Sequence, residues 1–213
     1  MTPGLFITFE GIEGCGKTTQ IRLLADHLRA AGRSVVLTRE PGGTPAAEAI
    51  RTILLDPAHD GLAPTTELLL YAAARAQHVH QVIRPAVGAG AVVLCDRFAD
   101  STEAYQGGGR ALSQETIQTL RKVATGDTWP DCTILLDLSA AEGLSRTRSR
   151  GALDRIEGEP LAFHERVRAA FLDIAAREPK RVAVVNAAAS VETVAEAVRV
   201  RIDALLREAE ATA

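Results

Sequence analysis

Cysteine is scarce in this sequence, and its placement argues against a domain held together by disulfides or zinc. The 213 residues include three cysteines, Cys15, Cys95 and Cys132, and no two of them have the CxxC spacing of zinc and redox motifs. An odd number without that spacing favours a reducing compartment over a disulfide framework. A chain of this length buries roughly 70% of its unfolded surface on folding, so its core does not need a disulfide or a zinc site for stability.

Long apolar runs and a strong charge imbalance are also missing. No run of 18 apolar residues occurs, and the first residues, MTPGLFITFEG, lack the features of a secretory signal, so we expect a cytoplasmic protein that does not enter a membrane. The formal net charge of −3 argues against nucleic acid as a partner, because duplex binding needs many cations to neutralise phosphates. The 46% hydrophobic and 24% charged residues are typical of a globular domain rather than a disordered chain.

Lysine is rare, with three residues against 21 arginines: Lys17, Lys122 and Lys180. Coding bias explains most of this skew. A lysine kept in such a chain still draws attention, because an ammonium is a compact point charge where guanidinium is a broad planar fork. Lys17 is the one that lies in a recognisable motif.

The apolar pattern predicts one α/β domain over residues 1–213. Short β-branched runs alternate with longer segments of helical period, which is typical of a parallel sheet with helices on both faces. The expected strands are 5–9, 34–38, 91–95, 133–138 and 182–186. The expected helices are 18–31, 65–87, 113–125, 140–148, 161–178 and 191–209. Pro85 predicts a kink or an end within the second of these helices, and the aperiodic segments 39–45 and 149–160 are candidate functional loops.

The strongest motif is GIEGCGKT, which matches GxxxxGK[ST] between an expected strand and an expected helix. Such a loop turns its backbone N–H groups around a phosphate, while Lys17 reaches the β- and γ-phosphates and the Thr18 hydroxyl can ligate Mg²⁺. The sequence therefore predicts a nucleoside triphosphate site. Its candidate residues are Gly11, Ile12, Glu13, Gly14, Cys15, Gly16, Lys17, Thr18 and Thr19.

A second cluster follows the third expected strand, where Asp96 and Arg97 reach the carboxyl edge of the sheet. The carboxylate can hold Mg²⁺ and the guanidinium can clamp an acceptor phosphate; the alternative is a strand-end salt bridge. Further on, Thr102 and Gln106 are four residues apart and share one face of a helical turn, where a hydroxyl and a carboxamide can read a base edge. In the expected helix 65–87, Tyr71 and Arg75 have the same spacing; in isolation they indicate a core residue and a solvated one.

Six stretches carry a resemblance to a known family: FEGIEGCGKTTQ, TREPGGTPAAEAIR, LLLYAAARAQHV, VVLCDRFADSTEAYQGGGR, PDCTILLDL and RGALDRIE. In this order they resemble bacterial thymidylate kinases, a group of P-loop nucleoside monophosphate kinases. The resemblance implies a P-loop NTPase fold and transfer of phosphate from MgATP to dTMP, giving dTDP for dTTP and DNA synthesis. It also implies a homodimer.

The resemblance further implies roles for individual residues. Thr18 and Asp96 resemble the Mg²⁺ ligands, Arg51 and Arg97 the arginines that grip the dTMP phosphate, and Tyr71 replaces the phenylalanine that usually stacks on thymine. Arg75, Thr102 and Gln106 resemble the residues that read the thymine edge, Tyr105 the one that excludes a ribose 2′-hydroxyl, and Glu13 and Glu40 the acids near the deoxyribose and the metal-bound waters. The implied substrate-binding residues are Glu13, Glu40, Pro41, Arg51, Tyr71, Arg75, Arg97, Thr102, Tyr105 and Gln106.

Some family members carry an arginine in the phosphate loop, where this chain has Cys15 and, instead, an arginine-rich lid at about 146–159. Its arginines are Arg146, Arg148, Arg150 and Arg155. We expect Arg150 and Arg155 to close over ATP and stabilise the transition state together with Lys17 and Arg97, and Arg146 to stack on adenine. For part of this run the alternative is a solvated helix face.

Two other functions stay open at this point. One is a P-loop kinase of another deoxynucleoside or monophosphate, and the other is a nucleotide-dependent switch without a small acceptor. The switch hypothesis gives no role to the DRF, AYQGGG and arginine-rich segments.

Overall fold

The computed structural model describes residues 4–149 and 153–211 and contains one five-stranded sheet. Its strands are β1 (Leu5–Glu10), β2 (Val35–Arg39), β3 (Val92–Asp96), β4 (Cys132–Asp137) and β5 (Val182–Asn186). Their order is β2-β3-β1-β4-β5, and the four neighbouring pairs are parallel. The predicted five-stranded parallel sheet is confirmed, with strand ends that differ by at most one residue.

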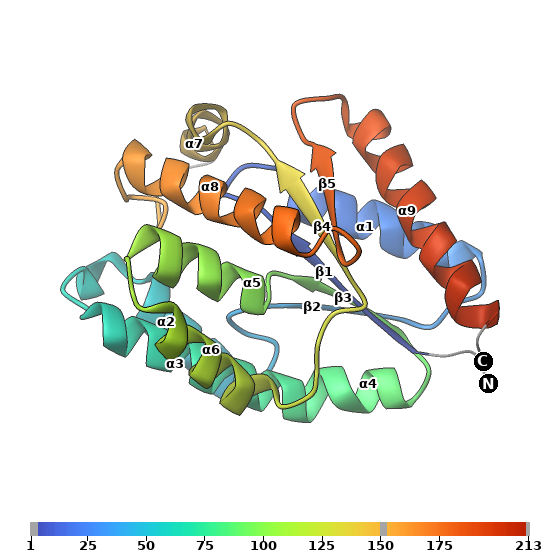
Figure 1. Ribbon diagram of the computed structural model, residues 1–213, viewed down its shortest axis with the longest axis horizontal. Helices are drawn as coiled ribbons and strands as arrows, with labels where there is room; N and C mark the ends of the chain where they lie inside the picture. Colours follow the sequence, from blue (N-terminus) through green and yellow to red (C-terminus); the bar gives the residue numbers. More distant parts are fainter. Residues whose placement is uncertain (1–3, 150–152, 212–213) are drawn as a thin grey trace.

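Two layers of helices cover this sheet (Figure 1). The helices are α1 (Lys17–Ala30), α2 (Pro45–Leu55), α3 (Pro64–His78), α4 (Arg84–Gly88), α5 (Ala99–Thr102), α6 (Gln114–Thr125), α7 (Ala140–Arg148), α8 (Leu161–Arg177) and α9 (Val191–Ala211). A 3₁₀ turn, η1 (Pro57–His59), and two π-helical segments, η2 (Val79–Ile83) and η3 (Glu103–Gly109), complete the described chain. The expected helices are present, whereas α2 and the segment 99–109 were not predicted as helical.

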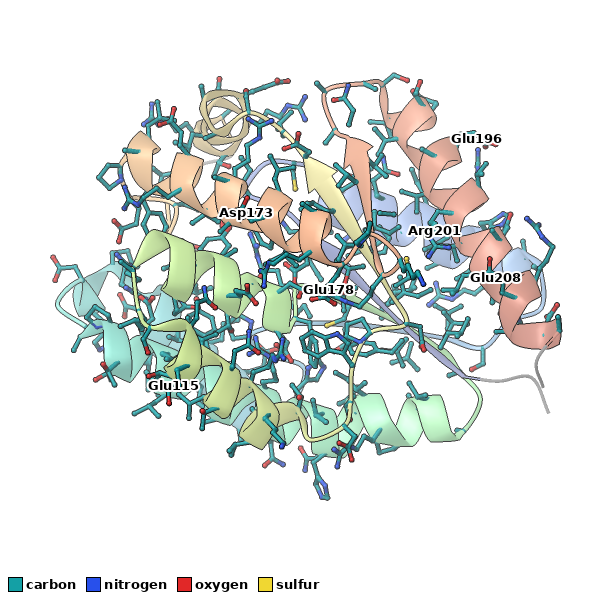
Figure 2. The ribbon with its side chains drawn as sticks, in the orientation of Figure 1. Glu115, Asp173, Glu178, Glu196, Arg201 and Glu208 are labelled. Carbon is teal, nitrogen blue, oxygen red and sulfur yellow. The ribbon has the colours of Figure 1, made fainter. Side chains whose placement is uncertain are left out.

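Side-chain alternation along the strands explains the two layers. On β1, Ile7 and Phe9 face one side and pack with residues of α1 and α9, whereas Phe6 faces the other and packs with η2 and the start of α5. The whole of β1 is buried because both faces are covered and both edges are paired. Charged residues on the outer faces of the helices, such as Glu115 and Glu196, point to solvent (Figure 2).

The expected helix 65–87 is interrupted where Pro85 predicted a kink. The segment η2 precedes Pro85 and widens the helix to π geometry before α4 begins at Arg84. Proline has no N–H and its ring clashes with the carbonyl four residues earlier, so a wider turn lets the chain continue. The segment η2 thus joins α3 to α4, and both helices lie below the sheet in Figure 1.

The helix α2 begins inside the segment that was predicted to be a loop. Thr44 is its N-cap, and the Thr44 hydroxyl accepts a hydrogen bond from the Ala47 N–H at 3.2 Å, with Pro45 in the first turn. Both features are favourable helix starts. Because α2 packs against α3, the two helices form a wall beside the carboxyl ends of β1 and β3. Among the described residues, none of the helices is long and apolar enough to cross a membrane.

Candidate active site

The phosphate loop joins the central strand β1 to α1. The Lys17 ammonium turns back across it and donates hydrogen bonds to the carbonyls of Gly11 at 3.1 Å and Ile12 at 3.0 Å. Gly14 has a φ of +73°, and a Cβ at this position would lie 2.2 Å from the carbonyl oxygen of Gly143 on α7. Only glycine lets the loop pass so close to α7, and this close contact holds the loop against α7.

Thr18 and Asp96 meet at the mouth of this loop, one from α1 and one from the end of β3. The Thr18 hydroxyl donates to Asp96 Oδ2 at 3.2 Å. A hydroxyl and one carboxylate fit Mg²⁺, which keeps several waters and takes its other ligands from phosphates. Within the described ranges no group of three or more His, Cys, Asp or Glu side chains could hold a metal alone, so an ion here would depend on the nucleotide.

Arg97 lies directly after Asp96 and reaches three parts of the site. Its guanidinium donates to the Gly11 carbonyl at 2.9 Å and to Glu13 Oε1 at 2.8 Å, and it lies 4.9 Å from the centre of the Tyr105 ring. Burial alone would lower the pKa of Arg97, but the facing Tyr105, Glu13 and Glu10 raise it well above its ordinary value. With φ at +71°, its backbone adopts a conformation that non-glycine residues rarely adopt.

A buried carboxylate on β1 holds this unusual turn. Glu10 accepts hydrogen bonds from the backbone N–H groups of Phe98 at 2.7 Å and Ser101 at 3.3 Å, and from the Ser101 hydroxyl at 2.6 Å. Its pKa is raised from 4.5 to about 7, mainly by burial and then by nearby Asp100, with Arg97 acting in the opposite direction. Sequence reasoning missed Glu10, because a single acid at a strand end has no distinguishing spacing.

The raised pKa of Glu10 predicts a pH-dependent stability. Between about pH 4.5 and 7 the unfolded chain has released this proton while the folded protein still holds it, so the free energy of unfolding falls as the pH rises. The contribution of Glu10 to this fall is about 3 kcal/mol and is complete above pH 7. Urea unfolding at pH 4.5 and at pH 8 should therefore show the Glu10→Gln variant gaining about this much relative to wild type. A difference between the two proteins that does not change with pH would contradict it.

Glu13 lies where the phosphate loop meets Arg97 and η3. Its Oε1 accepts from the Tyr105 hydroxyl at 2.6 Å as well as from Arg97, and its Oε2 lies 3.2 Å from Nδ1 of His164. Burial would raise the pKa of Glu13, but Arg97 and then His164, Lys17 and Tyr105 hold it well below its usual range. His164 is fully buried on α8 and was not predicted as a site residue, because a lone histidine in a helix gives no signal.

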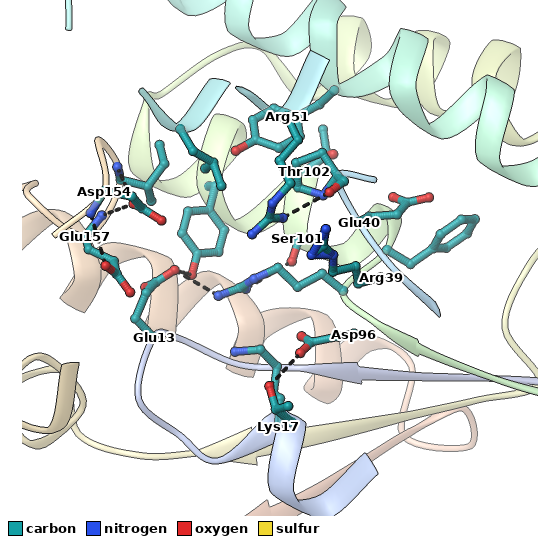
Figure 3. A pocket seen from close by; sticks show the side chains of 18 of the residues that line it. Glu13, Lys17, Arg39, Glu40, Arg51, Asp96, Ser101, Thr102, Asp154 and Glu157 are labelled. Atoms are coloured by element: carbon teal, nitrogen blue, oxygen red, sulfur yellow. Dashed lines mark hydrogen bonds and ion pairs between the residues drawn. The ribbon is translucent and has the colours of Figure 1, made fainter. Parts of the chain in front are cut away.

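A cavity of about 340 Å³ opens over these groups (Figure 3). It brings together most of the predicted site residues. Those lining it are Glu13, Gly14, Gly16, Lys17, Thr18, Thr19, Glu40, Pro41, Arg51, Tyr71, Arg75, Asp96, Arg97, Thr102, Tyr105 and Gln106. Cys15 is buried behind the loop with its sulfur 3.6 Å from Lys17 Nζ, and Gly11 and Ile12 face the loop interior through their carbonyls.

The far end of the cavity is organised by Arg75, which is 2% exposed. Its guanidinium donates to Glu40 Oε2 at 2.7 Å, to the Thr102 hydroxyl at 2.8 Å and to the Phe98 carbonyl at 3.0 Å. The Glu40 carboxylate also lies 3.0 Å from Nδ1 of His78. Glu40 thus lines the cavity, and its carboxylate is engaged by Arg75 and His78 rather than by groups at Thr18 and Asp96.

Arg51 and Tyr71 line the cavity wall that α2 and α3 form. Arg51 on α2 donates to the Pro41 carbonyl at 2.9 Å and faces the same space as Thr102 (Figure 3). Tyr71 on α3 is half-buried, and burial raises the pKa of its phenol, so the hydroxyl stays protonated at neutral pH. Asp154 and Glu157 line this wall from the other side and were not predicted.

The structure departs from the prediction most at the lid. Arg155 is buried, with Nε donating to the Leu54 carbonyl at 2.8 Å and Nη2 to Glu67 Oε2 at 2.5 Å. It lies against Leu54 and Glu67 rather than over the phosphate loop, because the buried Glu67 carboxylate needs a cation. A role over ATP therefore stays a prediction that requires Arg155 to leave Glu67.

Of the other lid arginines, neither Arg146 nor Arg148 lines the cavity. Arg146 is exposed on α7 and pairs with Glu142 one turn earlier at 2.6 Å. Arg148 is exposed on the same helix, and Arg150 lies outside the described residues. Among the described lid arginines, the interpretation as a solvated helix face fits Arg146 and Arg148.

Comparisons with known proteins agree with this geometry. Residues 9–198 match the family model described as thymidylate kinase. The chain is 57% identical to the thymidylate kinase of Geobacter sulfurreducens, over 92% of this chain and 94% of that protein, and 54% identical to that of Caulobacter vibrioides, over 93% and 95%. The crystal structure of thymidylate kinase from Ehrlichia chaffeensis superposes with a TM-score of 0.75 at 36% identity, covering 93% of this chain and 98% of that one. The chain belongs to the thymidylate kinase family.

Proposed function

We propose that this protein transfers the γ-phosphoryl group of ATP to dTMP, releasing ADP and dTDP for the synthesis of dTTP. The observation that carries the proposal is the single cavity that joins a phosphate loop to a base-sized end. Lys17 and Arg97 both bond the Gly11 carbonyl at its phosphate end, and Arg75 and Thr102, which bond each other, lie with Gln106 in the rest of the lining. Membership of the thymidylate kinase family supports the same acceptor.

The transfer needs no general base. A phosphomonoester has a second pKa of about 6, so the acceptor is already an anion near neutral pH. One of its oxygens forms the new bond to the γ-phosphorus as the bond to the β,γ-bridging oxygen breaks, and the electron pair leaves with ADP. Catalysis then consists of in-line positioning and charge neutralisation.

The residues of this chain divide these tasks. Lys17 and the loop N–H groups hold the donor phosphates, while Arg97 and Arg51 hold the acceptor phosphate. Thr18 and Asp96 would hold Mg²⁺, which when bound neutralises charge on the transferred group. The Glu13 carboxylate orients Arg97 and Tyr105, and it also places a negative charge beside the sugar, which favours a hydroxyl and disfavours a second phosphate there.

The substrate test is a coupled assay of ADP release from MgATP with dTMP, dUMP, dCMP, dGMP, AMP and thymidine as separate acceptors. We expect dTMP to give the highest kcat/KM and dUMP to follow at reduced efficiency, because burying the 5-methyl group contributes on the order of 1 kcal/mol. A preference for another monophosphate would favour the neighbouring kinase activities. Equal slow hydrolysis with every acceptor would instead favour a nucleotide-dependent switch, which the family membership does not support.

The homodimer and the cytoplasmic location are further parts of the proposal. Both rest on the resemblance and on the sequence, and light scattering of the purified protein tests the first. A mass near twice 22.6 kDa is expected.

A further inference from the structure

One buried carboxylate near the base end has no part in the mechanism above. Glu67 on α3 is 1% exposed and does not line the cavity. It accepts hydrogen bonds from Gln106 Nε2 at 2.8 Å, from Arg110 at 3.3 Å and from Arg155 Nη2 at 2.5 Å. Burial alone would raise the pKa of Glu67, but these three donors lower it, so the group is an anion at neutral pH.

The anion determines which way the Gln106 side chain faces. An ionised carboxylate only accepts hydrogen bonds, so Gln106 must turn its NH₂ group toward Glu67. Gln106 lines the cavity, and among the described residues none donates a hydrogen bond to its side-chain Oε1. The amide is therefore fixed with its acceptor, not its donor, available to a bound base.

Arg75 supplies the opposite group beside it. Three of its N–H groups donate to Glu40, Thr102 and Phe98, which leaves other N–H groups of the guanidinium available to a ligand. The base end thus offers a fixed donor and a fixed acceptor. Thymine presents an acceptor at O4 and a donor at N3, whereas cytosine presents a donor at N4 and an acceptor at N3. A pocket with this polarity matches thymine and opposes cytosine at both positions.

We propose that Glu67 is a positioning residue that sets the base selectivity of the site, by locking the Gln106 carboxamide so that it accepts a hydrogen bond from the base. This inference rests on the proposed function, because it takes thymine as the base. Arg110 and Arg155 contribute to this selectivity indirectly, because they keep Glu67 charged. Arg155 belongs to the lid, so the lid is linked to the recognition of the acceptor.

The test compares kcat/KM for dTMP, dCMP and dUMP in wild type and in Glu67→Gln. The neutral amide can donate or accept, so Gln106 can turn either way, and the ratio of dTMP to dCMP should fall at least ~10-fold. The ratio of dTMP to dUMP should stay within about two-fold of wild type, because uracil has the same hydrogen-bonding edge as thymine. A general loosening of the pocket would change both ratios.

A second variant and a control keep the test decisive. Glu67→Asp keeps the charge between the two arginines but withdraws it from Gln106, so it should fold and still lower the dTMP to dCMP ratio. Arg110→Ala leaves the bond between Gln106 and Glu67 intact, and Arg155 still pairs with Glu67 and keeps it charged, so both ratios should stay at the wild-type values. Folded Glu67 variants with the wild-type dTMP to dCMP ratio would overturn the inference alone, whereas a wild type that does not phosphorylate dTMP would overturn the proposed function and the inference with it.

Discussion

Lys17→Ala is expected to lower kcat at saturating MgATP by at least ~100-fold while leaving the fold intact. Lys17 is 8% exposed, and its ammonium is held across the phosphate loop by the carbonyls of Gly11 and Ile12, so it is in place before the nucleotide binds. Charge on the transferred group grows in the transition state, and a preorganised cation stabilises that state more than bound ATP. The loss should therefore fall on kcat and not only on KM for ATP.

Two variants serve as controls for Lys17. Lys122→Ala removes an exposed ammonium at the end of α6 and should keep wild-type kinetics. Lys17→Arg keeps the charge but replaces a point cation with a broad fork, so it should restore little of the activity. Steady-state kinetics with thermal unfolding of each protein measures both effects. A Lys17→Ala protein that keeps more than about a tenth of wild-type kcat would remove Lys17 from the transition-state contacts.

Arg97→Ala is expected to lower kcat/KM for dTMP by at least ~100-fold. The guanidinium lies between the Gly11 carbonyl and Glu13, with its fork at the phosphate end of the cavity. Losing it removes the clamp on the acceptor phosphate and also leaves Glu13 without its nearest cation. Both changes raise the energy of the transition state, because the acceptor dianion then meets an uncompensated carboxylate.

The unusual backbone at Arg97 supplies a matched control. Its φ of +71° suits glycine better than alanine, so Arg97→Gly should be more stable than Arg97→Ala by about 1 kcal/mol. The two variants both lack the guanidinium and should share the same loss of kcat/KM. If their activities instead followed their stabilities, the defect would come from the backbone turn and not from the missing charge.

Local signals predicted the parts of the site that depend on neighbours in sequence. The loop 11–18 has a spacing that glycine geometry and phosphate binding require, and Asp96 with Arg97 follows an apolar strand that ends at the correct edge. The sheet itself could be predicted because five short β-branched runs lie between helical periods. These features depend on the backbone and on the alternation of side chains.

The parts that could not be predicted depend on pairing across the fold. Arg155 has a basic lid around it in the sequence, but its position is set by Glu67, which lies 88 residues earlier. Glu10 gains its role only because the fold places the Phe98 N–H beside its carboxylate. His164 gains its role only because the fold places it beside the Glu13 carboxylate. The helix segment 99–109 contains three glycines, and its π geometry is stabilised by packing on α8 that no local propensity shows.

The strand order has a consequence for how the protein is made. The first strand lies at the centre of the sheet, and its partners are β3 and β4; Thr8 pairs through its hydroxyl with Thr133, 125 residues later. During synthesis the phosphate loop therefore leaves the ribosome long before either neighbour of β1 exists. Its apolar strand stays without a first partner until β3 has emerged, and without its second until β4 has emerged. We expect nascent chains that end before β4 to need chaperone protection and to bind no nucleotide.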